Sequence, residues 1–313
     1  MNGFIIINKP ASLTSHDVVD RLRKLTSVKQ IGHAGTLDPF ATGVLIVAIG
    51  NTTRLFEYTK SWSKTYEAEI TLGATSDTDD VTGTITPHPR PFSSLEEKGS
   101  PLLKRGEVGA PPGEEEIRKT LTSFLGPILQ VPPTYAAIKV KGKKLYEYAR
   151  IGETAVRKPR PVTIHSIKLL SYEYPFLKLE IHCGPGTYIR ALGRDIGEKL
   201  GTGAYVSRLE RKSIHTFHIS QSLSLSKLST TSLTSSLLPP ERLIEHLPQI
   251  TLSLDNVAKF KQGQAIALTA AQSREARDSE RSGIVSVFDE FHHLLGIGRF
   301  DPATSLLHPQ KVL

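Results

Sequence analysis

The sequence predicts an α+β fold in which a large domain of strands and helices precedes a small β-rich domain. A chain of 313 residues exceeds the usual size of one domain, which favours a large domain plus a small one. Over most of the chain, short apolar runs typical of strands alternate with segments whose apolar residues have helical spacing. From about Ile250 the pattern consists of short strands with glycines at the turns. We place the domain boundary between residues 245 and 246.

The composition is typical of a globular protein and is compatible with a polyanionic partner. The formal net charge is +8, and lysines and arginines that neutralise phosphates gain free energy from counterion release. The single cysteine, Cys183, excludes an internal disulfide and a multi-cysteine zinc site. The sequence has no run of 18 apolar residues and no basic region ahead of its first apolar segment. We therefore expect a cytoplasmic protein with no membrane partner.

The first expected elements are a buried strand and an amphipathic helix. Gly3 to Asn8 is short, rich in Ile and followed by Lys9-Pro10, as is typical of a buried strand. Ser15 is the expected N-cap of the helix, with Asp17 in its first turn. The apolar face of this helix then follows a spacing of about 3.6 residues, with Val18, Val19, Leu22 and Leu25.

The middle of the chain continues with strands and short helices. Lys64 to Leu72 alternates apolar and polar residues as a half-buried strand does. Thr75 to Gly83 is a polar turn with three acids, whose spacing lacks the glycine and glutamate of a calcium-binding EF-hand loop, so we assign them to capping or turn formation. The other expected elements are strands at Val44 to Ile49, Val162 to Leu170, Leu177 to Cys183 and Val206 to Leu209, and helices at Arg54 to Tyr58, Glu114 to Phe124 and from Arg190 to near Leu200.

Two segments lack a regular pattern. Residues 87–113 are rich in proline and glycine, which predicts a flexible surface insertion. Ser220 to Ser236 has the Ser- and Thr-rich composition of a linker. The alternative is that this second segment is anchored to the main body by its leucines, Leu223, Leu225 and Leu228.

A third segment, at about residues 130–152, combines tyrosines with basic side chains. Such a combination suits a surface that contacts phosphates and bases of RNA. The alternative is a helix with buried tyrosines and solvated lysines. The basic residues in this segment are Lys139, Lys141, Lys143, Lys144 and Arg150.

The most informative stretch is GHAGTLDPFATG, from Gly32 to Gly43. Its single acid, Asp38, lies between Leu37 and Pro39, in a loop whose glycines permit tight turns and close approach of a ligand. Pro39 fixes its own φ and restrains Asp38 before it. The pattern predicts a stiff loop that presents one carboxylate at the mouth of a buried strand. The alternative is a turn whose aspartate binds only its own backbone.

This stretch resembles the active-site motif of the bacterial tRNA pseudouridine-55 synthases. The chain also resembles that family, in the same order, at NKP (Asn8 to Pro10), KTY (Lys64 to Tyr66), PPTYAAIKVKGKKLYEYAR (Pro132 to Arg150) and GTYIRALGRDIGEKLG (Gly186 to Gly201). The resemblance implies a pseudouridine synthase domain at residues 1–245, with a mixed, mainly antiparallel central sheet flanked by helices. It also implies a small PUA-like RNA-binding domain at residues 246–313 and an RNA-clamping arm at about 130–152.

The resemblance assigns roles to individual residues. It implies that Asp38 acts as nucleophile or base, and that Arg190 pairs with this carboxylate. Tyr66 matches the tyrosine that contacts the uracil and takes the C5 proton late in the reaction. His33, Tyr188 and Leu209 match residues that bind the substrate: a histidine that stabilises the extruded T loop, a second tyrosine of the site and an apolar residue of the uracil pocket. Lys9, with Pro10, matches a pair that buttresses the catalytic loop, and we group Lys9 with the basic arm residues as an RNA-binding residue.

The chemistry that this family catalyses needs no cofactor. The bond from C1′ to N1 of uridine breaks, the uracil turns, and C5 joins C1′, without a redox step or net hydrolysis. No metal is expected, because His16, His33 and Asp38 lack a recognised ligand spacing. A nucleotide-dependent enzyme is not supported, because no glycine-rich loop ends in Gly-Lys-Ser/Thr.

The sequence leaves three functional hypotheses. The first is a stand-alone, monomeric enzyme that isomerises uridine 55 in the T arm of tRNA without a guide RNA. The second is the guide-RNA-dependent subunit of a ribonucleoprotein, and the clamp-like arm argues against it. The third is an RNA-binding protein that assists tRNA folding.

Overall fold

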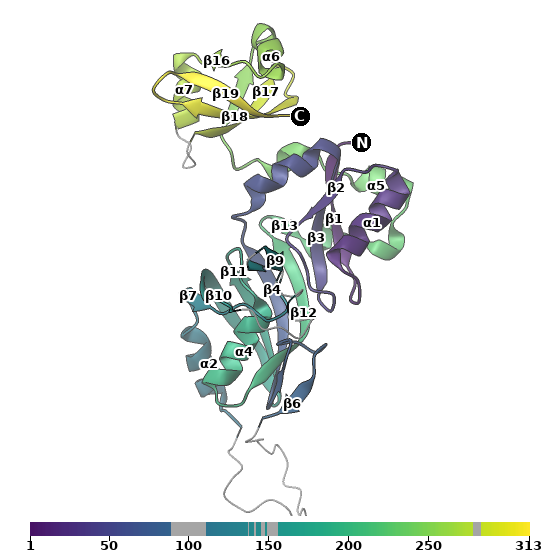
Figure 1. Cartoon of the computed structure of the whole chain (residues 1–313), viewed down its shortest axis with the longest axis vertical. Coiled ribbons are helices and arrows are strands. Elements are labelled where there is room, and N and C mark those ends of the chain that lie inside the picture. Colours follow the sequence, from purple (N-terminus) through teal and green to yellow (C-terminus); the bar gives the residue numbers. More distant parts are fainter. Residues whose placement is uncertain (89–110, 137, 141, 145–147, 149–155, 278–282) are drawn as a thin grey trace, which may run out of the picture.

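The computed structural model describes residues 1–88, 111–136, 138–140, 142–144, 148, 156–277 and 283–313. These residues form a large mixed sheet with helices and, at the C-terminal end of the chain, a second sheet with its own helices (Figure 1). None of the described helices is long and apolar enough to cross a membrane. The expected flexible insertion at 87–113 falls largely on residues 89–110, which lie outside the described residues.

The large sheet has ten strands in the order β14-β1-β3-β12-β4-β11-β10-β7, with β2 paired to β3 and β13 to β12. Among the described strands of this sheet, β1 with β14 and β3 with β12 are parallel pairs, and the other pairs are antiparallel. The prediction of a mixed, mainly antiparallel sheet is therefore confirmed. Its strands are β1 (Gly3–Lys9), β2 (Ile31–Ala34), β3 (Thr42–Ile49), β4 (Lys64–Leu72), β7 (Gly126–Gln130), β10 (Arg160–Glu173), β11 (Phe176–Cys183), β12 (Ala204–Ile214), β13 (Phe217–His218) and β14 (Leu223–Ser224).

Two small hairpins accompany this sheet. The first, β5 (Ala74–Ser76) with β6 (Ile85–Pro87), encloses the acidic turn that follows β4. The second, β8 (Lys139–Val140) with β9 (Lys143–Lys144), belongs to the segment expected to form the basic arm.

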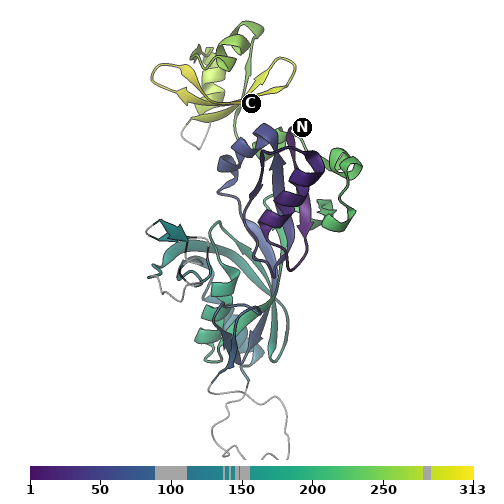
Figure 2. The same ribbon diagram turned by 45° about the vertical axis from the view of Figure 1, so that its right-hand side comes forward.

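Helices cover both faces of the large sheet. Near β1 and β3 lie α1 and α5, whereas α2 contacts β10, and α4 contacts β12 and β4 (Figures 1 and 2). Strand β3 reads as a continuous apolar run because alternate side chains enter two different hydrophobic clusters, one on each face. The helices of this domain are α1 (Ser15–Thr26), the 3₁₀ helix η1 (Gly50–Thr59), α2 (Glu114–Thr122), α4 (Ile189–Lys199), α5 (Thr230–Ser236) and the short 3₁₀ turns η2 (Ile219–Gln221), η3 (Leu225–Lys227) and η4 (Pro240–Leu243).

The N-terminus of α1 differs from the expected one by one residue. Thr14, not Ser15, is the N-cap, because Thr14 and Asp17 exchange hydrogen bonds as a capping box. Ser15 is buried, and its hydroxyl accepts a hydrogen bond of 2.9 Å from the backbone N–H of Leu37. The serine therefore ties α1 to the loop that carries Asp38.

The Ser- and Thr-rich segment is not a free linker. It forms η3 and α5, and its leucines Leu225 and Leu233 are buried against the cluster that also contains residues of α1 and β3. Ser229 caps α5 through a hydrogen bond from the backbone of Ser232. The alternative of a segment anchored to the main body is confirmed, because burial of its leucines stabilises the packed conformation despite the polar residues between them.

The C-terminal unit has a five-stranded sheet in the order β15-β17-β18-β19-β16. It also contains two helices that the pattern of short strands did not predict, α6 (Leu254–Lys261) and α7 (Ala270–Arg277). Its last strand contacts η1 through an ion pair of 2.9 Å between Lys311 and Glu57. The strands are β15 (Gln249–Leu252), β16 (Ile266–Ala267), β17 (Ile284–Asp289), β18 (Leu294–Asp301) and β19 (Leu306–Val312).

Gly43, at the start of β3, generates a prediction about stability. Its φ is +103°, and a Cβ atom built there would lie 2.3 Å from the carbonyl oxygen of Arg211 on β12. We expect Gly43→Ala to lower the free energy of unfolding by about 2–4 kcal/mol, because both the backbone conformation and the strand contact are lost. Urea denaturation followed by circular dichroism measures this change.

The matched control is Gly32→Ala, because a Cβ atom at Gly32 would meet its nearest neighbour at 3.8 Å and its φ is not left-handed. The control should retain wild-type stability within about 0.5 kcal/mol. Equal stability of the two variants would contradict the prediction.

Candidate functional site

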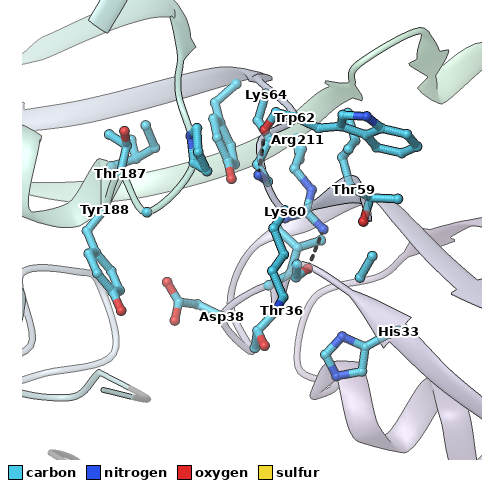
Figure 3. Close-up of a pocket in the computed structure, with 18 of the residues that line it drawn as sticks. His33, Thr36, Asp38, Thr59, Lys60, Trp62, Lys64, Thr187, Tyr188 and Arg211 are labelled. Atoms are coloured by element: carbon cyan, nitrogen blue, oxygen red, sulfur yellow. Dashed lines mark hydrogen bonds between the residues drawn. The ribbon is translucent and has the colours of Figure 1, made fainter. Parts of the chain in front are cut away.

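The large domain contains a cavity of about 540 Å³. Its walls come from the loop between β2 and β3, from the segment between η1 and β4, from the start of α4 and from β12. Asp38 faces this cavity from the loop, with Tyr188 and Arg211 on different sides of it (Figure 3). The predicted stiff loop therefore presents its carboxylate to a cavity large enough for a nucleobase.

The backbone of the Asp38 loop is fixed by contacts on both sides of the carboxylate. Before it, Leu37 is buried and bonded to Ser15 of α1. After it, the carbonyl of Pro39 accepts hydrogen bonds from the backbone N–H of Ser12 at 2.8 Å and from Lys9 Nζ at 3.2 Å. The loop is thus held by the segments around α1. Among the described backbone hydrogen bonds, the only one within the loop runs from the N–H of Ala41 to the carbonyl of Asp38, at 3.1 Å.

Asp38 and Arg190 form a bidentate pair. Arg190 Nε donates to Asp38 Oδ2 at 2.9 Å, and Arg190 Nη2 donates to Asp38 Oδ1 at 2.8 Å. The arginine side chain is 4% exposed, whereas the Asp38 side chain is 32% exposed. The guanidinium therefore fixes one side of the carboxylate, while part of the carboxylate remains open to the cavity.

A second acid, whose role the sequence pattern did not indicate, pairs with Arg190. Arg190 Nη1 forms an ion pair of 3.3 Å with the buried Asp80 and donates to the carbonyl of Thr78 at 3.0 Å. Asp80 also accepts a turn-type hydrogen bond from the N–H of Thr82, so the assignment to turn chemistry was correct but incomplete. The neighbouring Asp79 pairs with Arg194 at 2.8 Å. The presence of three acids in one short turn was the signal in the sequence for a role beyond the turn itself, because isolated surface turns rarely need several carboxylates.

Lys9 is not placed to bind RNA. It has no exposed surface, and its ammonium donates to the carbonyls of Pro10, Leu13 and Pro39. Burial lowers its pKa to about 8. The expectation of an RNA contact is therefore wrong, and the geometry instead matches the expected buttress of the catalytic loop.

The expected substrate-binding residues all line the same cavity. Tyr66 on β4 is buried, which raises the pKa of its hydroxyl, and the nearby Arg211 acts in the opposite direction. Burial, and after it the negative charge of Asp38, raises the pKa of Tyr188 at the start of α4. Leu209 on β12 is buried, lines the cavity and also belongs to the hydrophobic core. Burial and the positive charge of Arg211 lower the pKa of His33, which favours the neutral imidazole.

The basic arm is only partly described. Lys143 is exposed, and its ammonium lies 6.0 Å from the centre of the Tyr148 ring. Only the backbones of Lys139 and Lys144 are described, in β8 and β9. Lys141 and Arg150 lie outside the described residues.

Two basic residues of the cavity, Arg211 and Lys64, were given no role from the sequence, although Lys64 belongs to the KTY motif. Arg211 is fully buried, and its guanidinium donates to the carbonyls of Val44 and Gly35 at 2.8 Å each. Gly35 directly follows β2 and Val44 lies in β3, so Arg211 joins the two stems of the Asp38 loop. The signal was its position two residues after Leu209 on an alternating strand, which directs both side chains to the same buried face.

Solved structures with the same fold are found over almost the whole chain. A crystal structure of a Cbf5-Nop10-Gar1 complex matches with a TM-score of 0.70 at 24% identity, covering 99% of this chain and 84% of the other. An H/ACA ribonucleoprotein bound to a substrate RNA containing 2′-deoxyuridine matches with a TM-score of 0.68 at 22% identity, with the same coverage. At such identities the likeness shows the fold alone.

Two family models define the class of protein. Residues 23–189 match the model described as "TruB family pseudouridylate synthase (N terminal domain)" and residues 248–313 match "Pseudouridine synthase II TruB, C-terminal". The fold and these matches define a pseudouridine synthase, an isomerase. Within that class, the chain belongs to the TruB family, and the predicted family is confirmed.

Curated relatives agree with this assignment over their whole length. A protein of Dehalococcoides mccartyi named tRNA pseudouridine synthase B is 41% identical, covering 100% of this chain and 96% of the relative. Proteins with the same name from Bacillus licheniformis and Bacillus subtilis are 38% and 36% identical, each covering 100% of this chain and at least 97% of the relative.

The ion pair between Asp80 and Arg190 predicts an effect on the reaction. We expect Asp80→Asn to slow pseudouridine formation about 10- to 100-fold, because Arg190 then holds Asp38 less accurately. RNA affinity should change little, since Asp80 is buried behind Arg190. Single-turnover rates of tritium release from 5-tritiated uridine, with affinity measured by filter binding, test this. The control is Asp77→Asn in the same turn, whose carboxylate accepts from the N–H of Thr84; equal rates for the two variants would contradict the prediction.

The lowered pKa of Lys9 predicts a pH dependence of stability. Between about pH 8 and 10.5 the folded state has lost the Lys9 proton that the unfolded state still binds, so the contribution of this group to the free energy of unfolding rises with pH. The stability of wild type relative to Lys9→Met should therefore increase across this window and be constant below it. Urea denaturation of both proteins across the window measures the difference. The comparison of wild type with Lys119→Met, an exposed lysine of α2, should show no such trend, and a flat difference for Lys9 as well would refute the assignment.

Proposed function

We propose that this chain isomerises uridine 55 in the T arm of tRNA to pseudouridine, with Asp38 as the acting carboxylate. The observation that carries the proposal is the bidentate Asp38–Arg190 pair at the wall of a cavity lined by Tyr66, Tyr188 and Leu209. The curated relatives named tRNA pseudouridine synthase B support tRNA as the substrate. We further propose that the enzyme acts in the cytoplasm as a monomer without a guide RNA.

The reaction begins when the target nucleotide leaves the RNA stack and enters the cavity. The cavity offers an aromatic side chain at Tyr66 and an apolar one at Leu209 for the uracil. Both are buried, so their positions are fixed before the base arrives. Binding of the uracil therefore requires little ordering of these side chains, which reduces the entropic cost of reaching the reactive geometry.

Asp38 then acts at the sugar. Its ionised carboxylate either attacks C1′ or removes the 2′ proton, and in both cases the bond from C1′ to N1 breaks. The uracil turns, C5 bonds to C1′, and the proton on C5 is lost to a base, for which Tyr66 is the candidate. Arg190 keeps Asp38 oriented throughout, because its two charge-assisted hydrogen bonds hold both carboxylate oxygens.

RNA binding extends beyond the cavity in this proposal. Residues 1–245 form the catalytic domain, with the arm at about 130–152 as a clamp, and residues 246–313 form an RNA-binding domain. The net charge of +8 supports a broad contact with a polyanion. Recognition of the T arm rests mainly on loop shape and extruded bases, because the major groove of an A-form helix is too narrow for side chains to read.

The deciding experiment compares wild type with Asp38→Asn on an unmodified tRNA transcript. No guide RNA, metal or nucleotide is added, and binding is measured in parallel. We expect wild type to form pseudouridine at position 55 and Asp38→Asn to be at least about 10³-fold slower, with RNA binding retained. Primer extension after carbodiimide treatment locates the product.

The matched control is Glu115→Gln, which makes the same change from carboxylate to amide on the exposed face of α2. It should retain wild-type activity. Activity of Asp38→Asn within tenfold of wild type would refute the role of Asp38. Binding by both proteins with no modification by either would leave the RNA-binding hypothesis in place of catalysis on this substrate.

A further inference from the structure

Arg211 is a buried cation without an acidic partner. Its Nε and Nη2 donate to backbone carbonyls, and its Nη1 is buried with no hydrogen-bond partner among the described residues. Buried charges in proteins are normally paired, because removing an ion from water is costly. Arg190 illustrates the contrast, since that guanidinium meets both Asp38 and Asp80.

Lys64 brings a second cation to the same wall of the cavity. Its ammonium donates to the carbonyl of Trp62 at 3.0 Å, and burial and then the charge of Arg211 lower its pKa. A Cβ atom built on Gly35 would lie 3.5 Å from both Arg211 Nη1 and Lys64 Cε, so the two side chains flank one backbone position. Figure 3 shows both side chains across the cavity from Tyr188.

The carboxylates that line the cavity do not balance these cations. Asp38 is paired with Arg190, and Glu57 forms an ion pair of 2.9 Å with Lys311. Lys60 at the cavity wall adds a further positive charge. The part of the cavity around Gly35 therefore has an excess of positive charge beside the reacting carboxylate.

We propose that Arg211 and Lys64 form an anion-binding subsite that receives one phosphodiester group of the RNA substrate. Gly35 leaves room for this close approach, because it carries no side chain between the two cations. Lys64, which is partly exposed, makes the direct contact, whereas Arg211 strengthens the positive field from the buried side. The proposal rests on the proposed function, since it assumes that an RNA strand enters this cavity.

With this subsite, the two sides of the cavity have different functions. The side around Asp38, Arg190 and Tyr188 handles the sugar and the base, and the side around Arg211 and Lys64 anchors the strand. An anchor next to the reacting nucleotide fixes the position of C1′ relative to Asp38, which is where positioning affects rate most. Base-independent anchoring by a phosphate also suits a nucleotide whose base must turn during the reaction.

The test is a double-mutant cycle between the protein and the RNA backbone. A set of T-arm RNAs is made in which each carries one neutral methylphosphonate in place of a phosphodiester, at successive linkages around the target uridine. Dissociation constants are measured for wild type and for Lys64→Met, which keeps the length of the side chain and removes its charge. At one linkage we expect the methylphosphonate to weaken wild-type binding about tenfold and to leave Lys64→Met unaffected.

The control is Lys119→Met on α2, which should retain the full penalty at that linkage. The slope of log K against log salt should also fall in magnitude by about 1 for Lys64→Met. Lys64→Met should leave the hydrogen bonds of Arg211 to the carbonyls of Val44 and Gly35 in place. Thermal unfolding of the variant checks that the fold is intact.

Three results would overturn the proposal. Equal penalties for wild type and Lys64→Met at every linkage would show that no phosphate binds there. Coupling of Lys64 to a change in the uracil, but to no linkage, would assign the contact to the base. Stabilisation of wild type but not Lys64→Met by inorganic phosphate, without coupling to any linkage, would assign the subsite to a free anion. Pseudouridine formation by wild type is measured on the same RNAs, so its absence would refute the proposed function separately.

Discussion

The bidentate pair of Asp38 and Arg190 is the constraint on which the rest of the structure depends. It joins residues 152 positions apart in the chain, one in a loop and one at the start of a helix. A guanidinium that is almost fully buried is tolerated only when its donors are satisfied, and here Asp38, Asp80 and the carbonyls of Thr78 and Tyr135 accept them. Because removal of one partner from such a set leaves another charge unpaired, the loop, the acidic turn and α4 are coupled in position.

The large sheet holds these segments at the required distance. The parallel contact of β3 with β12 brings Gly43 against Arg211, and Arg211 in turn binds both stems of the Asp38 loop. On the other side, Lys9 and Ser15 hold the loop from β1 and α1. Each tie uses a backbone carbonyl or N–H of the loop rather than the carboxylate itself. The loop is therefore fixed without occupying the oxygens of Asp38 that face the cavity.

Much of the fold could be predicted from the sequence, and the limits have physical causes. The strand at β3 and the amphipathic helix α1 followed from local periodicity, because packing on both faces of the sheet imposes those patterns. The capping residue Thr14 and the anchored segment around Leu225 were decided by single contacts that composition does not report. The Asp38–Arg190 pair came from family resemblance, since no local pattern links positions so distant. The roles of Asp80, Arg211 and Lys64 were missed because only the three-dimensional packing brings Asp80 to Arg190, and Arg211 and Lys64 to the cavity.

The two buried arginines of the cavity differ in a way that explains its electrostatics. Arg190 is neutralised by two carboxylates, those of Asp38 and Asp80. Arg211 has no carboxylate partner in the described part of the chain, and burial followed by the charge of Arg211 lowers the pKa values of Lys64 and His33. The folded protein therefore carries an electrostatic cost that an anion bound at Gly35 would relieve. An RNA strand carries such an anion at every linkage, so under the proposed subsite the charge of Arg211 would favour binding of the strand.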